Sequence, residues 1–91
     1  MTKYRELVGV FAGIKSPEEM DRFLHEILTP KELEDVWRRW QILNEISEGF
    51  PQREIAERHQ MSLCKVTRGS KVLRKPQSIC RKIINQRKKQ K

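Results

Sequence analysis

The sequence predicts an all-α chain of six short-to-medium helices that includes a helix-turn-helix. Three observations lead to this prediction. Apolar residues recur at the three- and four-residue spacing of a helix face in each long segment. Ser-Pro and Thr-Pro pairs stand where helices would begin, and no segment alternates as a strand does. A chain of 91 residues suits one core, so a single domain is expected over 1–91.

Two helices are expected in the first third of the chain. The first ends near Gly13 and carries an apolar stripe, Tyr4, Leu7, Val8 and Phe11. Ser16 can cap the second helix, Pro17 fits its first position, and Glu19 can close a capping box. Its apolar stripe consists of Met20, Phe23, Leu24 and Ile27.

A third helix follows and is the longest of the six. Thr29 caps it, Pro30 opens it, and Glu32 can reach back to the cap. Gly49 is its expected stop. Its apolar positions are Leu33, Val36, Trp37, Trp40, Leu43 and Ile46. The spacing of the two tryptophans indicates core or dimer-interface residues rather than platforms on which bases stack.

Residues 52–73 read as a helix-turn-helix. Pro51 opens a short helix from Gln52 to about His59, and a second runs from Leu63 to about Arg74. The turn between them lacks a glycine, so Gln60 must adopt a left-handed backbone, and Ser62 can cap the second helix. Ala56 is small enough for the helices to cross closely, over a knot of Ile55, Met61, Leu63 and Val66.

The last helix begins after the break at Pro76. It carries Ile79, Cys80, Ile83 and Ile84, and we expect it to fray into a basic tail over 85–91. This tail is expected to be solvated and to add nonspecific affinity for phosphate.

The net charge of +8 is distributed unevenly. Residues 1–51 hold seven Lys/Arg and ten Asp/Glu, whereas residues 52–91 hold 13 Lys/Arg and two Asp/Glu, a net charge of +11. Such asymmetry indicates a polyanionic partner. The basic segment also has the helix start and stop residues of a helix-turn-helix, which favours DNA over a membrane surface as that partner. The second helix of the motif should present a basic face of Lys65, Arg68, Lys71 and Arg74 to the major groove.

Several functions are not expected. Cys64 and Cys80 have no metal-binding spacing, so we expect no metal, and two free thiols favour the cytoplasm. The first residues lack a signal peptide, and no stretch has the ~18 apolar residues of a membrane span. No nucleophile–base arrangement is evident, and His25 and His59 have no partners that suggest catalysis. An enzyme is therefore not expected.

Two segments resemble the tryptophan repressor family. One is Leu28-Thr29-Pro30-Lys31-Glu32 leading to Arg38-Arg39. The other is Gln52-Arg53-Glu54-Ile55 continuing to Val66-Thr67-Arg68-Gly69-Ser70. The resemblance covers roughly residues 24–76, with one residue fewer before Gln52 than is usual. It implies an intertwined homodimer that represses genes of tryptophan metabolism by binding operator DNA when loaded with L-tryptophan, a corepressor ligand rather than a cofactor.

The resemblance also implies which residues hold tryptophan. Arg39 and Arg68 correspond to arginines that sandwich the indole ring, and guanidinium planes do stack on aromatic faces. Arg68 and Thr29 would hold the carboxylate, Gly69 would leave room for the ring, and backbone carbonyls of Glu26 and Leu28 would accept from the ammonium. Taken without the family, Arg39 could pair with Glu45 or Asp35, Thr29 would be a cap alone, and Gly69 a packing glycine.

Charge and resemblance together predict the DNA-binding residues. These are Gln52, Arg53, Ser62, Cys64, Lys65, Thr67, Lys71 and Arg74. The sequence departs from the family at two positions. Val72 stands where a serine helps to hold the ligand's amino group, which puts tryptophan selectivity in question but keeps this position in the expected ligand site. Lys65 replaces a threonine, which suggests another operator sequence or stronger phosphate anchoring.

Two alternatives stay open. The first is a helix-turn-helix regulator of the same fold that does not respond to tryptophan, and responds either to nothing or to another indole compound; Val72 motivates it. The second is a promoter-binding module like the last domain of a sigma factor, since the run Arg53-Glu54-Ile55-Ala56-Glu57-Arg58 is common in such modules. A sigma-like module would be a monomer that depends on polymerase, whereas a repressor would be a stable dimer.

Overall fold

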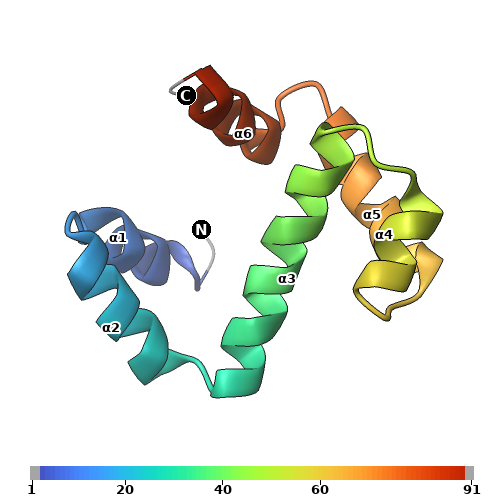
Figure 1. Cartoon of the computed structure of the whole chain (residues 1–91). Helices are drawn as coiled ribbons and strands as arrows, with labels where there is room; N and C mark the ends of the chain where they lie inside the picture. Colours follow the sequence, from blue (N-terminus) through green and yellow to red (C-terminus); the bar gives the residue numbers. More distant parts are fainter. Residues whose placement is uncertain (1–2, 90–91) are drawn as a thin grey trace. The chain divides into compact units, whose positions relative to one another are not determined.

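The computed structural model describes residues 3–89, and this range contains six helices and no strand (Figure 1). The helices are α1 (Arg5–Gly13), α2 (Pro17–Ile27), α3 (Pro30–Ser47), α4 (Gln52–Arg58), α5 (Leu63–Arg74) and α6 (Ile79–Lys89). The all-α prediction is confirmed, and each expected helix is present. None of the described helices is long and apolar enough to span a membrane.

The chain divides into two compact units, residues 1–35 and residues 36–91, and α3 runs across the boundary. The first unit contains α1 and α2, joined by an edge-to-face contact between the rings of Phe11 and Phe23, whose centroids lie 5.1 Å apart. Helix α1 has no buried residue. The single domain expected over the whole chain stays a prediction.

The caps of α2 and α3 show how the sequence starts these helices. The backbone amide of Glu32 donates to the Thr29 hydroxyl (3.2 Å), and the amide of Thr29 donates to the Glu32 carboxylate (2.9 Å). This is the complete capping box that the sequence predicts. The bond from the Thr29 amide also holds the pKa of Glu32 below its usual value. At Ser16 only one bond of the box is present: the amide of Glu19 donates to the Ser16 hydroxyl (3.3 Å), and that hydroxyl in turn donates to the Glu18 carboxylate (2.8 Å).

The end of α3 is set by Gly49, as predicted. Its backbone φ is +92°, a conformation that favours glycine. The amide of Gly49 donates to the carbonyl of Ile46, and the amide of Phe50 donates to that of Glu45. These two bonds form a Schellman motif, which satisfies carbonyls at the end of the helix and redirects the chain into α4.

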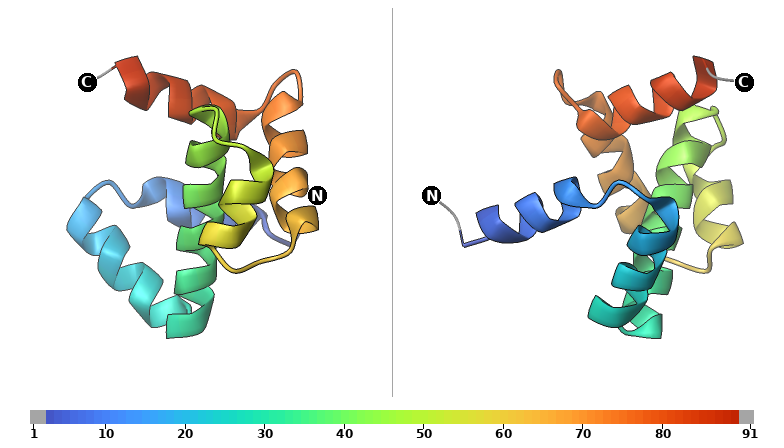
Figure 2. Two further views of the ribbon diagram at one scale, coloured as in Figure 1. Left: turned by 45° about the vertical axis from the view of Figure 1, so that its right-hand side comes forward. Right: turned by 90° about the vertical axis from the view of Figure 1, so that its left-hand side faces the viewer.

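The core of the second unit lies where α4 and α5 meet α3 (Figure 2). The cluster consists of Ile42, Ile55, Ala56 and Val66, with Ile46 and Met61 packed against it. The knot predicted for the helix-turn-helix is therefore confirmed, except at one position. Leu63 was expected inside, but it is the first residue of α5 and is 42% exposed. The first turn of α5 buries Val66 instead.

The tryptophans on α3 do not form a core within the single chain. Trp37 is half-exposed, as is its neighbour Val36, while Trp40 is partly buried. The only buried apolar residue of α3 is Ile42, in the second half of the helix. This exposure leaves the dimer interface as the expected role of Trp37.

Helix α6 is anchored to the ends of two other helices. The Arg81 guanidinium donates to the carbonyls of Leu73 (3.1 Å) and Pro76 (2.7 Å), and the Lys88 ammonium donates to the carbonyl of Ser47 at the end of α3 (3.1 Å). Ile84 is buried. The expectation that the helix frays from residue 85 is wrong, because α6 continues to Lys89; residues 90–91 of the predicted tail lie outside the described range.

Candidate nucleic-acid interface

Helices α4 and α5 form the helix-turn-helix that the sequence predicts. Four residues, 59–62, separate them. Gln60 has a φ of +52°, the left-handed conformation expected in the absence of a glycine. The amide of Met61 donates to the carbonyl of Ala56 (3.0 Å), which closes the end of α4. The turn therefore reverses the chain tightly enough to lay α5 against α4.

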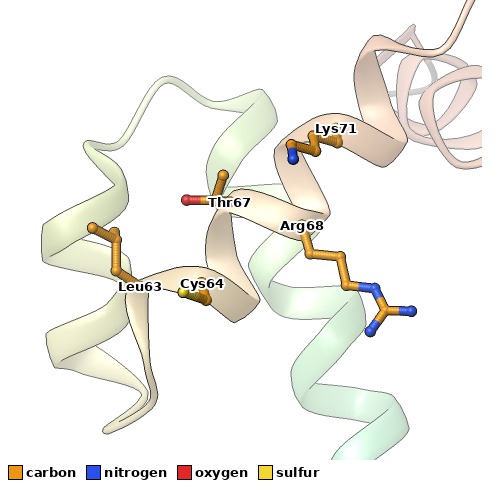
Figure 3. Close-up of a pocket in the computed structure, with 5 residues that line it drawn as sticks. All are labelled: Leu63, Cys64, Thr67, Arg68 and Lys71. Atoms are coloured by element: carbon orange, nitrogen blue, oxygen red, sulfur yellow. The ribbon is translucent and has the colours of Figure 1, made fainter.

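The outer face of α5 is basic. All four cations expected there are exposed, and so is Cys64. Figure 3 shows a shallow hollow on this face, with Arg68 extending away from Leu63 and Thr67. The hollow is lined by Leu63, Cys64, Thr67, Arg68 and Lys71. An exposed helix with cations on one face fits the major groove and the phosphates beside it.

Residues at the start of α4 and α5 complete this face. Arg53 and Ser62 are exposed. Ser62 stands at the N-cap of α5 but its side chain makes no capping bond, so the predicted cap is present in backbone position only. The Thr67 hydroxyl donates to the side-chain oxygen of Gln52 (2.9 Å) and thereby joins α5 to α4. Both of these side chains are half-buried.

A cluster of charged and aromatic side chains fastens the helix-turn-helix to α3. Glu45, with a side chain 12% exposed, accepts from Arg58 at 2.9 Å and lies 2.7 Å from Nε2 of His59. Arg58 also donates to Glu54 and lies over the ring of Phe50, 4.7 Å from its centroid. We call these five residues the Glu45 cluster.

Sequence reasoning missed this cluster and treated His59 as a plain turn residue. The signal available was a histidine at a position where helix-turn-helix proteins usually have an apolar residue. A polar residue at a buried position requires a partner. Glu45 supplies it from 14 residues earlier. Because Glu45 contacts α4 and the turn, the alternative that it pairs with Arg39 gains no support.

We expect Glu45→Ala to destabilise the protein. The substitution leaves His59 without its partner in a site where its side chain is only 11% exposed, and it removes one of the two carboxylates beside Arg58. The cost should be about 1–3 kcal/mol of unfolding free energy, mostly from His59 because Arg58 is well exposed. Urea denaturation measures it. Glu48→Ala, an exposed residue on the same chain segment, is the control and should cost less than about 0.5 kcal/mol. Equal losses in both variants would contradict this account.

The residues expected to hold tryptophan are divided between the two units. Arg39 on α3 and Arg68 on α5 are exposed, and Val72 on α5 is partly buried; all belong to the second unit. Glu26, Leu28 and Thr29, at the end of α2 and the start of α3, belong to the first unit. Their assembly into one ligand site stays a prediction.

Gly69 has a packing role that needs no ligand. A Cβ built on it would lie 3.3 Å from Cδ1 of Ile46, closer than most such contacts, and 3.4 Å from Cδ2 of Leu43. The missing side chain therefore lets α5 approach α3 closely, which offsets the poor helix propensity of glycine. The alternative of a packing glycine is supported, and a role in making room for an indole ring stays a prediction.

Among the described residues, no group of His, Cys, Asp and Glu could hold a metal ion, and both cysteines are free thiols. The exposed side chains of the helix-turn-helix include cations and hydrogen-bond donors. This is the chemistry of a surface that binds the phosphates and base edges of DNA.

Comparison with protein families agrees with this geometry. A family model described as Trp repressor protein matches residues 2–88, which include both compact units and the whole helix-turn-helix. No curated protein and no solved structure matched the chain. The family is one of DNA-binding transcription regulators. Because the match extends over nearly the entire chain, this protein belongs to the Trp repressor family.

Proposed function

We propose that this protein is a homodimeric repressor that binds palindromic operator DNA when it is loaded with L-tryptophan. The observation that carries the proposal is the family match over residues 2–88. The basic outer face of α5 supports the DNA-binding part. Two copies would place two such helices on half-sites about one helical turn apart, a geometry for which this family is itself a known example.

Tryptophan recognition would depend on two guanidinium groups. Arg39 and Arg68 are both exposed, so the planar faces of their guanidinium groups are accessible to an indole ring. Stacking on the ring and pairing with the ligand carboxylate are both within the chemistry of arginine. Thr29 keeps a hydroxyl hydrogen for the same carboxylate, since its oxygen accepts from the Glu32 amide.

Calorimetric titration with L-tryptophan, with sedimentation on the same sample, tests the proposal. We expect saturable heat at one ligand per chain and a dimer at micromolar concentration. The absence of heat would contradict the claim that L-tryptophan is the corepressor. A stable monomer would contradict the claim that the protein binds a palindromic operator as a dimer. The DNA probe for the experiments below is a palindromic duplex selected by the wild-type protein from a random pool.

Lys71→Ala should weaken DNA binding without affecting tryptophan. Lys71 is exposed on the outer face of α5, where an ammonium neutralises a phosphate. The plot of log K against log salt should lose about one unit of slope, and affinity should fall about equally for selected and random duplexes. Fluorescence anisotropy over a range of salt concentrations measures both. Lys15→Ala, a cation of the first unit, is the control, and an unchanged slope in Lys71→Ala would contradict the assignment.

A second candidate is a regulator of the same fold that responds to a different ligand. The observation that favours it is Val72, which lacks a hydroxyl and is partly buried on α5. A ligand without an ammonium group, such as an indole carboxylic acid, would need no hydroxyl there. Titration with indole-3-propionate beside L-tryptophan separates the two candidates. The family match leaves the sigma-like alternative without support.

A further inference from the structure

The hydrogen bond between Thr67 and Gln52 connects the two helices of the motif. These residues are 15 positions apart, and their side-chain hydrogen bond links α4 to α5. Gln52 is the first residue of α4, and Thr67 lies in the second turn of α5. Both side chains are half-buried, and this restricts the conformations that they can adopt.

The direction of this bond determines what Gln52 can offer to a ligand. The Thr67 hydroxyl donates to the carboxamide oxygen of Gln52 at 2.9 Å. Because the oxygen takes part in this bond, the amide nitrogen and its two hydrogens are the part of the side chain that can donate to a ligand. A neutral amide with two N–H donors suits a phosphate, because it can donate a hydrogen bond to a phosphate oxygen.

The surroundings also suit a phosphate. Thr67 lines the hollow on the outer face of α5, and Lys71 lies one turn later on the same helix (Figure 3). Arg53, exposed, follows Gln52 directly. A donor pair at the junction of the two helices is therefore flanked by a cation on each helix.

We propose that Thr67 is a positioning residue for DNA binding: its hydroxyl fixes the carboxamide of Gln52 so that the amide nitrogen donates to a backbone phosphate. This inference rests on the proposed DNA-binding function and assigns Thr67 a role through Gln52 rather than a contact of its own. Holding a side chain in its bound conformation before binding removes an ordering cost of about 0.5–1.5 kcal/mol, equivalent to about 2- to 13-fold in affinity.

A double-mutant cycle tests the pair. Thr67→Val keeps the β-branched shape and removes the hydroxyl, and Gln52→Ala removes the amide. We expect Thr67→Val to weaken binding of the selected duplex about 2- to 13-fold in the wild-type background and less than about 2-fold in the Gln52→Ala background. Thr67→Ser, which keeps the hydroxyl, should retain wild-type affinity. Thermal melting of each variant gives the fraction folded, by which the affinities are corrected.

The outcomes separate this inference from the function on which it rests. Equal losses from Thr67→Val in both backgrounds would show that Thr67 contacts DNA itself, and no loss in either would show that the bond serves folding alone; both overturn the proposal. Gln52→Glu keeps an oxygen that can accept from Thr67, but its carboxylate would repel the phosphate. The affinity of this variant for the selected duplex should therefore fall below that of Gln52→Ala. If the wild-type protein selects no duplex, the proposed function itself fails.

Discussion

Arg68→Ala should abolish the effect of tryptophan on DNA binding. The substitution removes a guanidinium plane that we expect to stack on the indole ring and to pair with the ligand carboxylate. Stacking and a charge-assisted bond together are worth about 2–4 kcal/mol, so tryptophan should bind about 30- to 700-fold more weakly. Calorimetry measures the ligand affinity, and anisotropy with the selected duplex measures the response.

Arg68→Lys is the matched control for this prediction. Lysine keeps the positive charge on the exposed face of α5 but loses the planar donor surface. We expect it to restore most of the DNA affinity measured without tryptophan and little of the tryptophan response. If Arg68→Ala instead lowers DNA affinity equally with and without tryptophan, Arg68 acts on the phosphate backbone and not on the corepressor.

Ile55→Ala should have the largest effect on stability. Ile55 has no exposed surface and belongs to the cluster that joins α4 and α5 to α3. Removing three buried carbon atoms and leaving a cavity should lower the free energy of unfolding by about 2–5 kcal/mol. This is a large part of the roughly 5–15 kcal/mol available to a small protein. Chemical denaturation followed by circular dichroism measures the change.

Leu63→Ala provides the comparison, because it removes the same number of carbon atoms from a residue that is 42% exposed. We expect it to cost less than about 1 kcal/mol. If the two variants were equally destabilised, Leu63 would be part of the core in solution, as its helical spacing alone suggests, and the arrangement of α5 described above would be wrong.

The sequence predicts the fold well where local chemistry decides it. Pro30 and the Thr29–Glu32 box fix the start of α3, Gly49 fixes its end, and the left-handed Gln60 follows from a turn without glycine. These features depend on neighbouring residues, whose preferences can be read directly. The extent of α6 was missed, since Lys88 is held by the carbonyl of Ser47, 41 residues away in the chain.

Features that depend on contacts between helices were harder to predict. Helical periodicity does not distinguish the inner from the outer side at the first residue of a helix, so Leu63 was misplaced. The pairing of His59 with Glu45, and of Thr67 with Gln52, requires knowing which helices meet. The basic face of α5, in contrast, follows from the three-residue spacing of its cations and was predicted in full.

The affinity of the protein for its selected duplex, measured over a range of L-tryptophan concentrations, tests the central claim most directly. We expect the Kd to fall by about 5- to 150-fold and to level off once the ligand saturates, as a coupling between two sites requires. A Kd that is the same with and without L-tryptophan would contradict the claim and leave a DNA-binding member of the Trp repressor family controlled in another way.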